Sequence, residues 1–573
     1  MKTTAASAPA VLAPFTLVAL LAARPAPAAQ EGGAGRAAQR VPERGLRLRA
    51  EDALEGFTLI APLRSHDTLL LDMQGEVVHR WTSELPPGNS AYLLDDGTLL
   101  RCAREPGAPV FEGGGQGGRV QLLAPDGALL WDFDYASEEH LQHHDVAPLP
   151  NGNVLLIAWE RKTRDEAIAA GRDPAQIGER GLWPDFLVEI EPVRPDGGVV
   201  VWEWHAWDHL IQDFDPEKAN FGDVAAHPER IDLNADHRDQ PPLSAAERRR
   251  LRELEQEMRG LGYTGGGGGG DDDEEAENDD DERGGPGRRG QRGRPRGGDW
   301  LHTNSVDRDP ARDLIVLSLR ELSEIWIIDH STTTAEAAGS TGGRHGHGGD
   351  LLFRWGNPRT YGAGAADERR LFVQHDASFV PAGSPGAGHV LVFNNGEGRP
   401  GGQYSSVDEI ALPYEEGRGF VRAEGAAWPP AAPVWSYVAP QPESLFSAFI
   451  SGAQRLANGN TLICSGAQGR LLEVRPGGEV VWEYLSTHGG DAADERGGPP
   501  GRRGARGGGP PPGAGFPRGE RPPRAGGPGG PGGMDRTGLF RATRLTPDHP
   551  GLAALLGAKG ARDGRRARDG DGR

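Results

Sequence analysis

Residues 300–320 read WLHTNSVDRDPARDLIVLSLR and contain one complete copy of a unit that recurs along the chain. The unit starts at His302, runs through a short apolar strand to an Asp-Pro turn, and leaves along a second apolar strand that ends at Arg320. Residues 142–160 (QHHDVAPLPNGNVLLIAWE) and 373–393 (VQHDASFVPAGSPGAGHVLVF) have the same layout. Gly, Pro, Asn and Asp between apolar runs are typical of tight turns between strands. A histidine therefore holds one fixed place in three strand pairs.

A second repeat ends each unit, in which a turn with Asp or Gly precedes a few aliphatic residues and a tryptophan. It occurs six times, ending at Trp81, Trp131, Trp202, Trp355, Trp435 and Trp482. Apolar strands precede most copies, so strands come in fours at intervals of roughly 45–50 residues where no insertion intervenes. This pattern predicts the blades of a β-propeller, and the regular aromatic signature disfavours the alternative, an array of β-sandwiches. We expect an all-β, six-bladed propeller with helical and disordered insertions.

The C-terminal part of the chain is expected to close the ring. Residues 539–545 (LFRATRL) form an apolar strand that no tryptophan unit follows, whereas the first unit lacks an inner strand. We predict that this strand, within a C-terminal segment over residues 535–556, completes the first blade. Closure of this kind removes the open edges of the sheets.

The N-terminus has the pattern of a secretory signal peptide. Lys2 precedes an apolar run to Ala23 that is too short for a spanning helix, and small residues follow it. An uncleaved anchor is the alternative. No later stretch is long enough to span a membrane, so we expect export to the periplasm or the extracellular space.

The other boundaries follow from composition. Residues 243–258 predict a helix with apolar spacing, and the acidic run 271–283 lacks the alternating ligands of a calcium loop, so we expect it to be solvated. The expected segments are a signal peptide (1–29), a linker (30–53), the propeller (54–487) with an insertion (205–300, partly disordered), a disordered Gly/Pro/Arg-rich segment (488–534), the closing segment (535–556) and a disordered tail (557–573).

Charge and cysteine content exclude several classes of partner and cross-link. The formal net charge of −21 argues against nucleic acid or an anionic membrane as a partner. Cys102 and Cys464 lie in matching strands of the second and sixth units, which are not neighbours in the ring. We therefore expect two buried free thiols and no disulfide.

The histidines are expected to converge, because the inner strands of a propeller line its central channel. The matching positions at one mouth hold Asn89, His144, His302, His375 and, within one residue, Ser451. Three imidazoles suggest either a zinc site or an anion site with a nucleophilic histidine. Arg320 and Asn304 favour the anion site, because a guanidinium and an amide suit a tetrahedral oxyanion and are not usual zinc ligands. The hairpin after His302 would return Arg320 to its side.

These residues resemble the bacterial aryl-sulfate sulfotransferases of the type that does not use the nucleotide sulfate donor. The resemblance covers about residues 54–556. Its marks are the QHHD segment, the H-x-N of His302 and Asn304 followed by Arg320, the QHD segment of His375, the loop NNGEGR (394–399) and the terminal FRATRLTPDHPGL.

The resemblance implies a ping-pong transfer of a sulfuryl group from a phenolic sulfate to a phenol, through a sulfohistidine and without a cofactor or metal. It implies that His375 is the nucleophile, that His144, His302 and Arg320 are catalytic, and that Asn304, Asn395 and Arg399 bind substrate. Some relatives dimerise through a small N-terminal β-domain, for which residues 30–54 leave no room.

Two other functions remain open at this stage. One is a metal-dependent or phosphohistidine ester hydrolase that uses the same histidines, and the other is a propeller that binds a ligand without catalysis. Asp145 and Asp376 directly follow His144 and His375, so on a strand they would point the other way. We expect both carboxylates to have structural roles.

Overall fold

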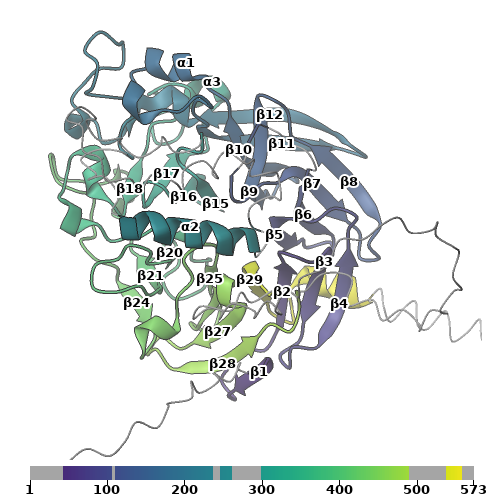
Figure 1. Cartoon of the computed structure of the whole chain (residues 1–573). Helices are drawn as coiled ribbons and strands as arrows, with labels where there is room; N and C mark the ends of the chain where they lie inside the picture. Colours follow the sequence, from purple (N-terminus) through teal and green to yellow (C-terminus); the bar gives the residue numbers. More distant parts are fainter. Residues whose placement is uncertain are drawn as a thin grey trace, which may run out of the picture. The chain divides into compact units, whose positions relative to one another are not determined.

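The computed structural model describes residues 43–105, 110–111, 113–236, 245–260, 263, 298–489 and 537–557. Figure 1 shows six antiparallel sheets arranged around a central axis, which confirms the six-bladed propeller. The predicted signal peptide, the acidic run 271–283, residues 490–536 and residues 558–573 lie outside the described part of the chain.

Six inner strands surround the axis. They are β29 (Leu539–Leu545), β5 (Pro87–Leu93), β9 (His140–Pro148), β15 (Thr303–Asp309), β19 (His375–Phe379) and β25 (Gly452–Arg455). Each contacts the next in this order, and β25 contacts β29, so the ring is closed. Blades 1 to 6 are numbered here from β29 to β25.

Three further strands stand behind each inner strand. The second strands are β2 (Phe57–Pro62), β6 (Leu99–Arg104), β10 (Val154–Glu160), β16 (Leu314–Leu319), β20 (Val390–Asn394) and β26 (Thr461–Ser465). The third strands are β3 (Asp67–Leu71), β7 (Gly118–Leu123), β11 (Asp185–Val193), β17 (Glu324–Asp329), β21 (Ser406–Ile410) and β27 (Arg470–Val474). The outer strands are β4 (Val77–Thr82), β8 (Leu129–Asp134), β12 (Gly197–His205), β18 (Phe353–Trp355), β24 (Trp435–Val438) and β28 (Val480–Leu485). The second strands are nearly continuous apolar runs because both of their faces pack against neighbouring blades.

The C-terminal strand closes the propeller as predicted. Strand β29 pairs antiparallel with β2, and Leu545 lies opposite Phe57. The predicted linker over residues 30–53 is wrong in its last part, because β1 (Gly45–Arg49) adds a fifth strand to blade 6 by pairing with β28. Its alternating Leu and Arg side chains suit an edge strand, a pattern that the surrounding Gly and Arg residues obscure in the sequence.

The six repeated tryptophans join the blades at the rim. Each lies on an outer strand, and its indole N–H donates a hydrogen bond to the next blade around the ring. The bonds run from Trp81 to Ala124 O (3.2 Å), Trp131 to Gly197 O (2.7 Å), Trp202 to Thr332 Oγ1 (3.1 Å), Trp355 to Pro430 O (2.7 Å), Trp435 to Pro476 O (2.8 Å) and Trp482 to Met73 O (3.0 Å). The last bond returns to blade 1, so the tryptophan repeat closes the ring a second time.

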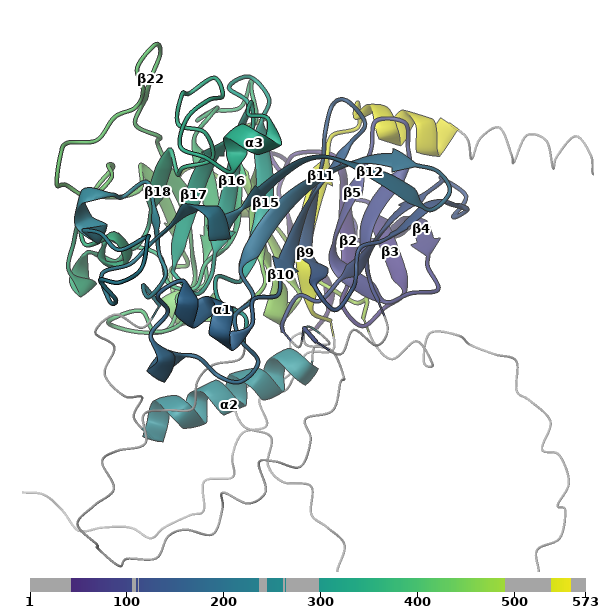
Figure 2. The same ribbon diagram turned by 90° about the horizontal axis from the view of Figure 1, so that it is seen from above.

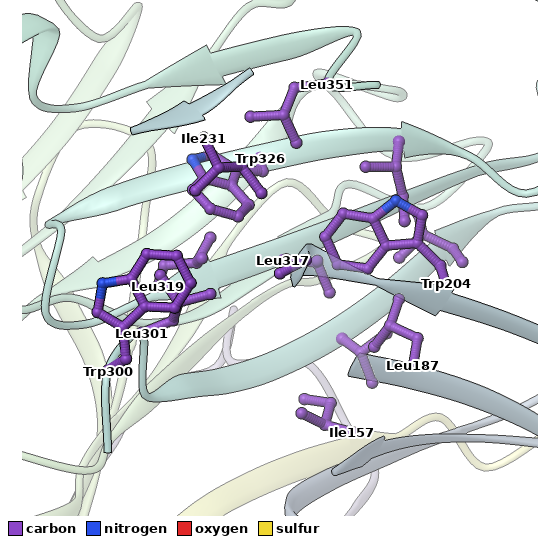
Figure 3. Packing of buried hydrophobic residues seen from close by; sticks show 14 of the residues in the cluster. Ile157, Leu187, Trp204, Ile231, Trp300, Leu301, Leu317, Leu319, Trp326 and Leu351 are labelled. Atoms are coloured by element: carbon purple, nitrogen blue, oxygen red, sulfur yellow. The ribbon is translucent and has the colours of Figure 1, made fainter. Parts of the chain in front are cut away.

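Apolar layers fill the space between blades. Figure 3 shows the layer between blades 3 and 4, where Trp204 and Leu187 of one sheet pack beside Leu317 and Trp326 of the next. Trp300 extends the same cluster to the residues just before β15. The inner strands on either side are thereby held at a fixed spacing around the axis.

The predicted helical insertion is α2 (Ala245–Gly260). In Figure 1 it crosses in front of the centre of the ring, and Figure 2 shows it on one face of the propeller, with helical residues 550–557 at the opposite face. The smaller elements are α1 (Arg164–Ala169), α3 (Thr334–Ala337), β13 (Leu210–Ile211), β14 (Ile231–Asp232), β22 (Tyr414–Glu415) and β23 (Gly419–Phe420). Among the described residues, none of the helices has the length and apolar character needed to cross a membrane. Cys102 and Cys464 are buried free thiols, as predicted.

Candidate active site

The inner strands depart from regular strand geometry at one level of the channel. The residues there with a left-handed backbone are Asn89 (φ 96°), His144 (φ 54°), His302 (φ 53°), Asp376 (φ 57°) and Ser451 (φ 90°). In β5, β9 and β19 the strand register also shifts at this level. A left-handed residue other than glycine costs on the order of 1–3 kcal/mol and is tolerated where the surroundings fix it. The strained level coincides with the channel-mouth positions inferred from the sequence.

His144 and His302 meet at this level, with ring centroids 4.5 Å apart and ring planes at 71°. The Nε2 atoms of both rings face the hydroxyl of Tyr263, at 2.6 Å from His144 and 3.2 Å from His302. Tyr263 follows α2 and is only 1% exposed. The site therefore contains a phenol that belongs to the chain itself. No pattern in the sequence pointed to Tyr263.

A chain of polar contacts fixes the protons of His144. Its Nδ1 lies 2.7 Å from Nδ1 of His143, and His143 Nε2 lies 3.3 Å from Asp185 Oδ1. The 3.3 Å pair lacks hydrogen-bond geometry, but the nearby carboxylate favours a proton on His143 Nε2, which leaves His143 Nδ1 to accept from His144 Nδ1–H. His144 Nε2 then has a free lone pair for the Tyr263 hydroxyl. Burial holds the pKa of His144 well below its usual 6.5, and the neighbouring His302 and His143 lower it further.

Asp299 plays the corresponding part for His302. Its Oδ2 accepts a 2.5 Å hydrogen bond from His302 Nδ1, so Nδ1 carries a proton and Nε2 faces the phenol. A carboxylate in this position also stabilises an imidazolium that forms during a reaction. The Asp-x-x-His spacing just before β15 was a signal in the sequence that we did not use.

His375 is held as a neutral imidazole. Its Nδ1 lies 2.8 Å from Asn395 Oδ1, so this nitrogen donates, and its Nε2 accepts a 3.2 Å hydrogen bond from the backbone N–H of Ile450. Burial lowers the pKa of His375 well below 6.5, and the positive charge of Arg320 lowers it further. The buried ring therefore stays unprotonated over a wider pH range than a solvated imidazole.

Arg320 returns to the histidines as the hairpin predicted. Its backbone N–H donates to the carbonyl of His302 (3.3 Å), and its guanidinium pairs with Glu321. Its charge acts on both His375 and Tyr263. The structure therefore brings His144, His302, His375 and Arg320 together at one end of the channel.

The three predicted substrate-binding residues lie elsewhere or have other contacts. Asn304 donates to Gln374 O (2.8 Å) and accepts from Asp376 N (3.4 Å), so its amide holds the peptides on both sides of His375.

The amide N–H groups of Asn395 bind the carbonyls of Ser447 (2.7 Å) and Ile450 (2.9 Å), while its oxygen holds His375. The guanidinium of Arg399 stacks on Tyr404 at 4.5 Å and donates to Ser406 Oγ at 3.0 Å. Asn304 and Asn395 thus position His375 and Arg399 packs against an aromatic ring, and substrate binding by these three residues stays a prediction.

Arg541 of β29 forms the floor of the site and was also missed. It contacts Asp145 Oδ2 at 2.5 Å and Asp376 Oδ1 at 2.9 Å, and donates to the carbonyl of Asn304 at 2.8 Å. The two aspartates thus point away from the histidines and have the structural role that we expected. Beyond Arg541 the channel widens into a cavity of about 350 Å³, lined by residues of all six inner strands.

Metal ligands do not gather in the described part of the chain, where no group of three or more His, Cys, Asp or Glu side chains has an arrangement that could hold a metal ion. The imidazoles of His144 and His302 have a phenolic hydroxyl between them, and Nδ1 of His375 faces an amide. These residues fit acid, base and nucleophile roles better than a zinc site.

Solved structures with a similar chain course are distant. A protein of unknown function from Bacteroides caccae is 11% identical, with 75% of this chain and 94% of that chain covered and a TM-score of 0.35. Virginiamycin B lyase from Staphylococcus aureus is 7% identical, with 78% and 90% covered and a TM-score of 0.32. Likenesses at this level carry no argument about activity. No curated protein matches the sequence.

A family comparison is informative. The model of the arylsulfotransferase (ASST) family matches residues 68–485, which is most of the chain and contains the histidine repeats, Arg320, blades 2 to 5 in full and the four main strands of blade 6. The chain therefore belongs to the arylsulfotransferase family, whose members are aryl sulfotransferase enzymes.

Proposed function

We propose that this enzyme moves a sulfuryl group between phenols by a ping-pong mechanism with a sulfohistidine intermediate at His375. One observation carries the proposal: a phenolic oxygen lies between Nε2 of His144 and Nε2 of His302. That oxygen belongs to Tyr263 and marks where the oxygen of a donor or acceptor phenol would bind. The substrates are small phenolic sulfates and phenols, and the signal peptide pattern of residues 1–29 supports a reaction outside the cytoplasm.

In the first half-reaction, His375 Nε2 attacks the sulfur of the aryl sulfate. The N–S bond forms while the bond from sulfur to the phenolic oxygen breaks, and the phenolate departs. Asn395 Oδ1 accepts the hydrogen bond from Nδ1–H and so keeps the lone pair on Nε2. Because burial keeps His375 neutral, this lone pair is unprotonated at neutral pH, and it can attack once the hydrogen bond from Ile450 N–H is broken.

Arg320 supplies positive charge for the sulfuryl oxygens. Sulfuryl transfer, like phosphoryl transfer, has a loose transition state, so the protein contributes alignment and charge stabilisation more than covalent chemistry. The carboxylate of Glu321 beside Arg320 fixes the guanidinium at the level of His302.

In the second half-reaction, the Tyr263 hydroxyl gives way and an acceptor phenol occupies its position between the two imidazoles. His144, neutral and with a free Nε2 lone pair, takes the phenol proton as the oxygen attacks sulfur and the N–S bond breaks. The phenolate of the next donor needs one proton on departure, and the imidazole returns it. With a second proton on Nε2, His302 donates to the charged oxygen in both directions, and Asp299 stabilises the imidazolium.

The test is release of nitrophenol from p-nitrophenyl sulfate with and without added phenol. Wild-type release is expected to increase with phenol, and His375→Ala is expected to lower it by at least about 10³-fold. His389→Ala is the matched control, because His389 lies in blade 5 at the other end of the same hairpin and binds Glu409. Its rate should stay within about twofold of wild type. Unchanged release in His375→Ala contradicts the nucleophile assignment.

A further inference from the structure

Tyr263 is the one phenol that the described residues place against the histidines, and nothing in the proposed reaction requires it. Its hydroxyl is 2.6 Å from His144 Nε2 and 3.2 Å from His302 Nε2, and its side chain is almost fully buried. Burial raises its pKa, so the oxygen carries its proton. The protein therefore holds a neutral phenol in the position and protonation state that an acceptor needs.

The surroundings of Tyr263 are shaped to its ring. A Cβ on Gly114 would lie 2.5 Å from the Tyr263 ring, and a Cβ on Gly115 would lie 2.1 Å from His144 Nε2. Phe449 packs against the other side of the phenol, with ring centroids 5.7 Å apart. Because Gly114 and Gly115 have no side chains, they leave room for one aromatic ring beside His144.

Helix α2 places Tyr263 at the mouth. The backbone N–H of Tyr263 donates to Met258 O at 3.0 Å, which continues the last turn of the helix. Leu254 is buried in a cluster with Phe449, Ile450 and Phe540 at the channel mouth. Arg250 contacts Glu397 of the 394–399 loop at 3.4 Å. Three separate contacts therefore hold the segment that carries the phenol.

His144 Nε2 lies where it can take the Tyr263 proton as the phenol oxygen bonds to sulfur. The contacts from Asp185 through His143 leave His144 Nε2 without a proton, and its lowered pKa keeps it so. Tyr92 provides a comparison within the same channel: its hydroxyl donates to Asp145 at 2.7 Å and so faces a carboxylate on the structural side of Arg541. Of these two buried phenols, Tyr263 is the one bonded to the catalytic imidazoles.

We propose that Tyr263 is an acceptor within the chain, which competes with external phenols and takes the sulfuryl group from His375. The inference rests on the proposed sulfuryl transfer. In this step the N–S bond of sulfated His375 breaks, a bond forms between sulfur and the Tyr263 oxygen, and the phenol proton passes to His144. The product is itself an aryl sulfate, so the same site can return the group to an external phenol.

The experiment uses the full chain and p-nitrophenyl sulfate without added phenol. After brief mild acid, which removes a sulfuryl group from histidine, peptides are analysed by mass spectrometry. We expect one retained sulfuryl group on the peptide that contains Tyr263. Tyr263→Phe should lack it and should show a KM for external phenol lowered by about fivefold, because the competing ring has lost its hydrogen bonds.

Tyr361→Phe is the matched control, because Tyr361 is equally buried but stacks on Arg354 instead of facing the histidines. This variant should keep both the modification and the wild-type KM. An enzyme that releases nitrophenol but leaves Tyr263 unmodified overturns the inference alone. A wild-type enzyme that releases no nitrophenol, with or without phenol, overturns the proposed function as well.

Discussion

The two ends of the central channel are built from the same six inner strands but have different chemistry. At one end the strands have left-handed residues and register shifts, and His144, His302 and His375 are buried under α2 and Tyr263. At the other end the strands carry proline and apolar residues around an open cavity of about 350 Å³. Arg541 and its two aspartates separate the two ends.

The difference shows how six similar blades can form one cluster of histidines at only one end of the channel. A regular strand alternates its side chains between faces, so equivalent residues on successive blades would repeat the same environment. The left-handed residues change the direction of the chain at one level, which holds imidazoles from three blades and brings those of His144 and His302 into contact. Each imidazole then has its own partner. His144 contacts His143, which lies near Asp185, whereas His302 contacts Asp299 and His375 contacts Asn395. These partners give different roles to chemically identical rings.

The largest expected effect is on activity at the histidine end. Arg320→Ala should lower kcat/KM for p-nitrophenyl sulfate by about 10²–10³-fold, because the charge that stabilises the transferring group is lost. Arg308→Ala is the control at the cavity end, where Arg308 pairs with Asp313. Its rate should stay within about twofold of wild type. Equal losses in the two variants would show that both ends take part in catalysis.

The ion pairs of Arg541 with Asp145 and Asp376, which lie between the two ends, are expected to contribute strongly to stability. Arg541→Met leaves Asp145 and Asp376 as buried charges without their partner, which should lower the free energy of unfolding by about 3–5 kcal/mol. Urea denaturation measures the change. Arg418→Met, which removes an exposed pair with Glu415, should cost less than about 1 kcal/mol. If Arg541→Met lowered the free energy of unfolding by an equally small amount, the buried ion pairs of Arg541 would not be important for stability.

A smaller, pH-dependent effect is expected at the cavity end. Burial raises the pKa of Asp307 to about 7 from its ordinary 3.8, despite a hydrogen bond from Phe379 N. Between these values the folded chain keeps a proton that the unfolded chain releases, so this group lowers stability as pH rises from about 4 to about 7.

Asp307→Asn should therefore stabilise the protein by on the order of 1–2 kcal/mol at pH 8, after allowance for solvent screening of a partly exposed side chain. At pH 4 the variant and the wild type should have nearly equal stability. Unfolding curves at the two pH values test this, and an equal gain at both would assign the effect to packing instead of ionisation.

The smallest expected effect is the response of activity to mild acid. The pKa values of His144 and His375 lie well below 6.5, so both rings remain neutral between pH 8 and pH 6.5. The pH profile of kcat/KM should be flat from pH 8 down to 6.5 and should fall only at lower pH. A loss of activity that begins at or above pH 6.5 would indicate that His144 and His375 are exposed to solvent in the active enzyme, and would contradict their burial in this structure.

Much of the fold was predictable because it depends on local repeats. The six tryptophan units, the strand pairs and the unpaired strand 539–545 identified the number of blades and the closure of the ring, and the position of each histidine within its unit placed it at one mouth. The strand at Gly45–Arg49 was missed because a short Leu/Arg alternation within a Gly-rich region resembles a linker.

The rest of the site depends on contacts between distant segments. Arg541 is in a segment quoted for its family resemblance, but its place under the histidines follows from the pairing of β29 with β2, which local sequence does not reveal. Tyr263 lies at the end of a helix within an insertion, next to a glycine run, and no repeat predicts its position. Asn304 was assigned to substrate because its amide could bind an oxyanion, whereas the neighbouring strand uses that amide to hold the backbone around His375.

The central claim is that a covalent intermediate forms at the histidine end before the acceptor reacts. Initial rates with p-nitrophenyl sulfate and phenol both varied test it most directly. The account predicts parallel lines in double-reciprocal plots, because the donor phenol leaves before the acceptor occupies the position between His144 and His302. Intersecting lines would contradict it, because they require donor and acceptor to be bound together.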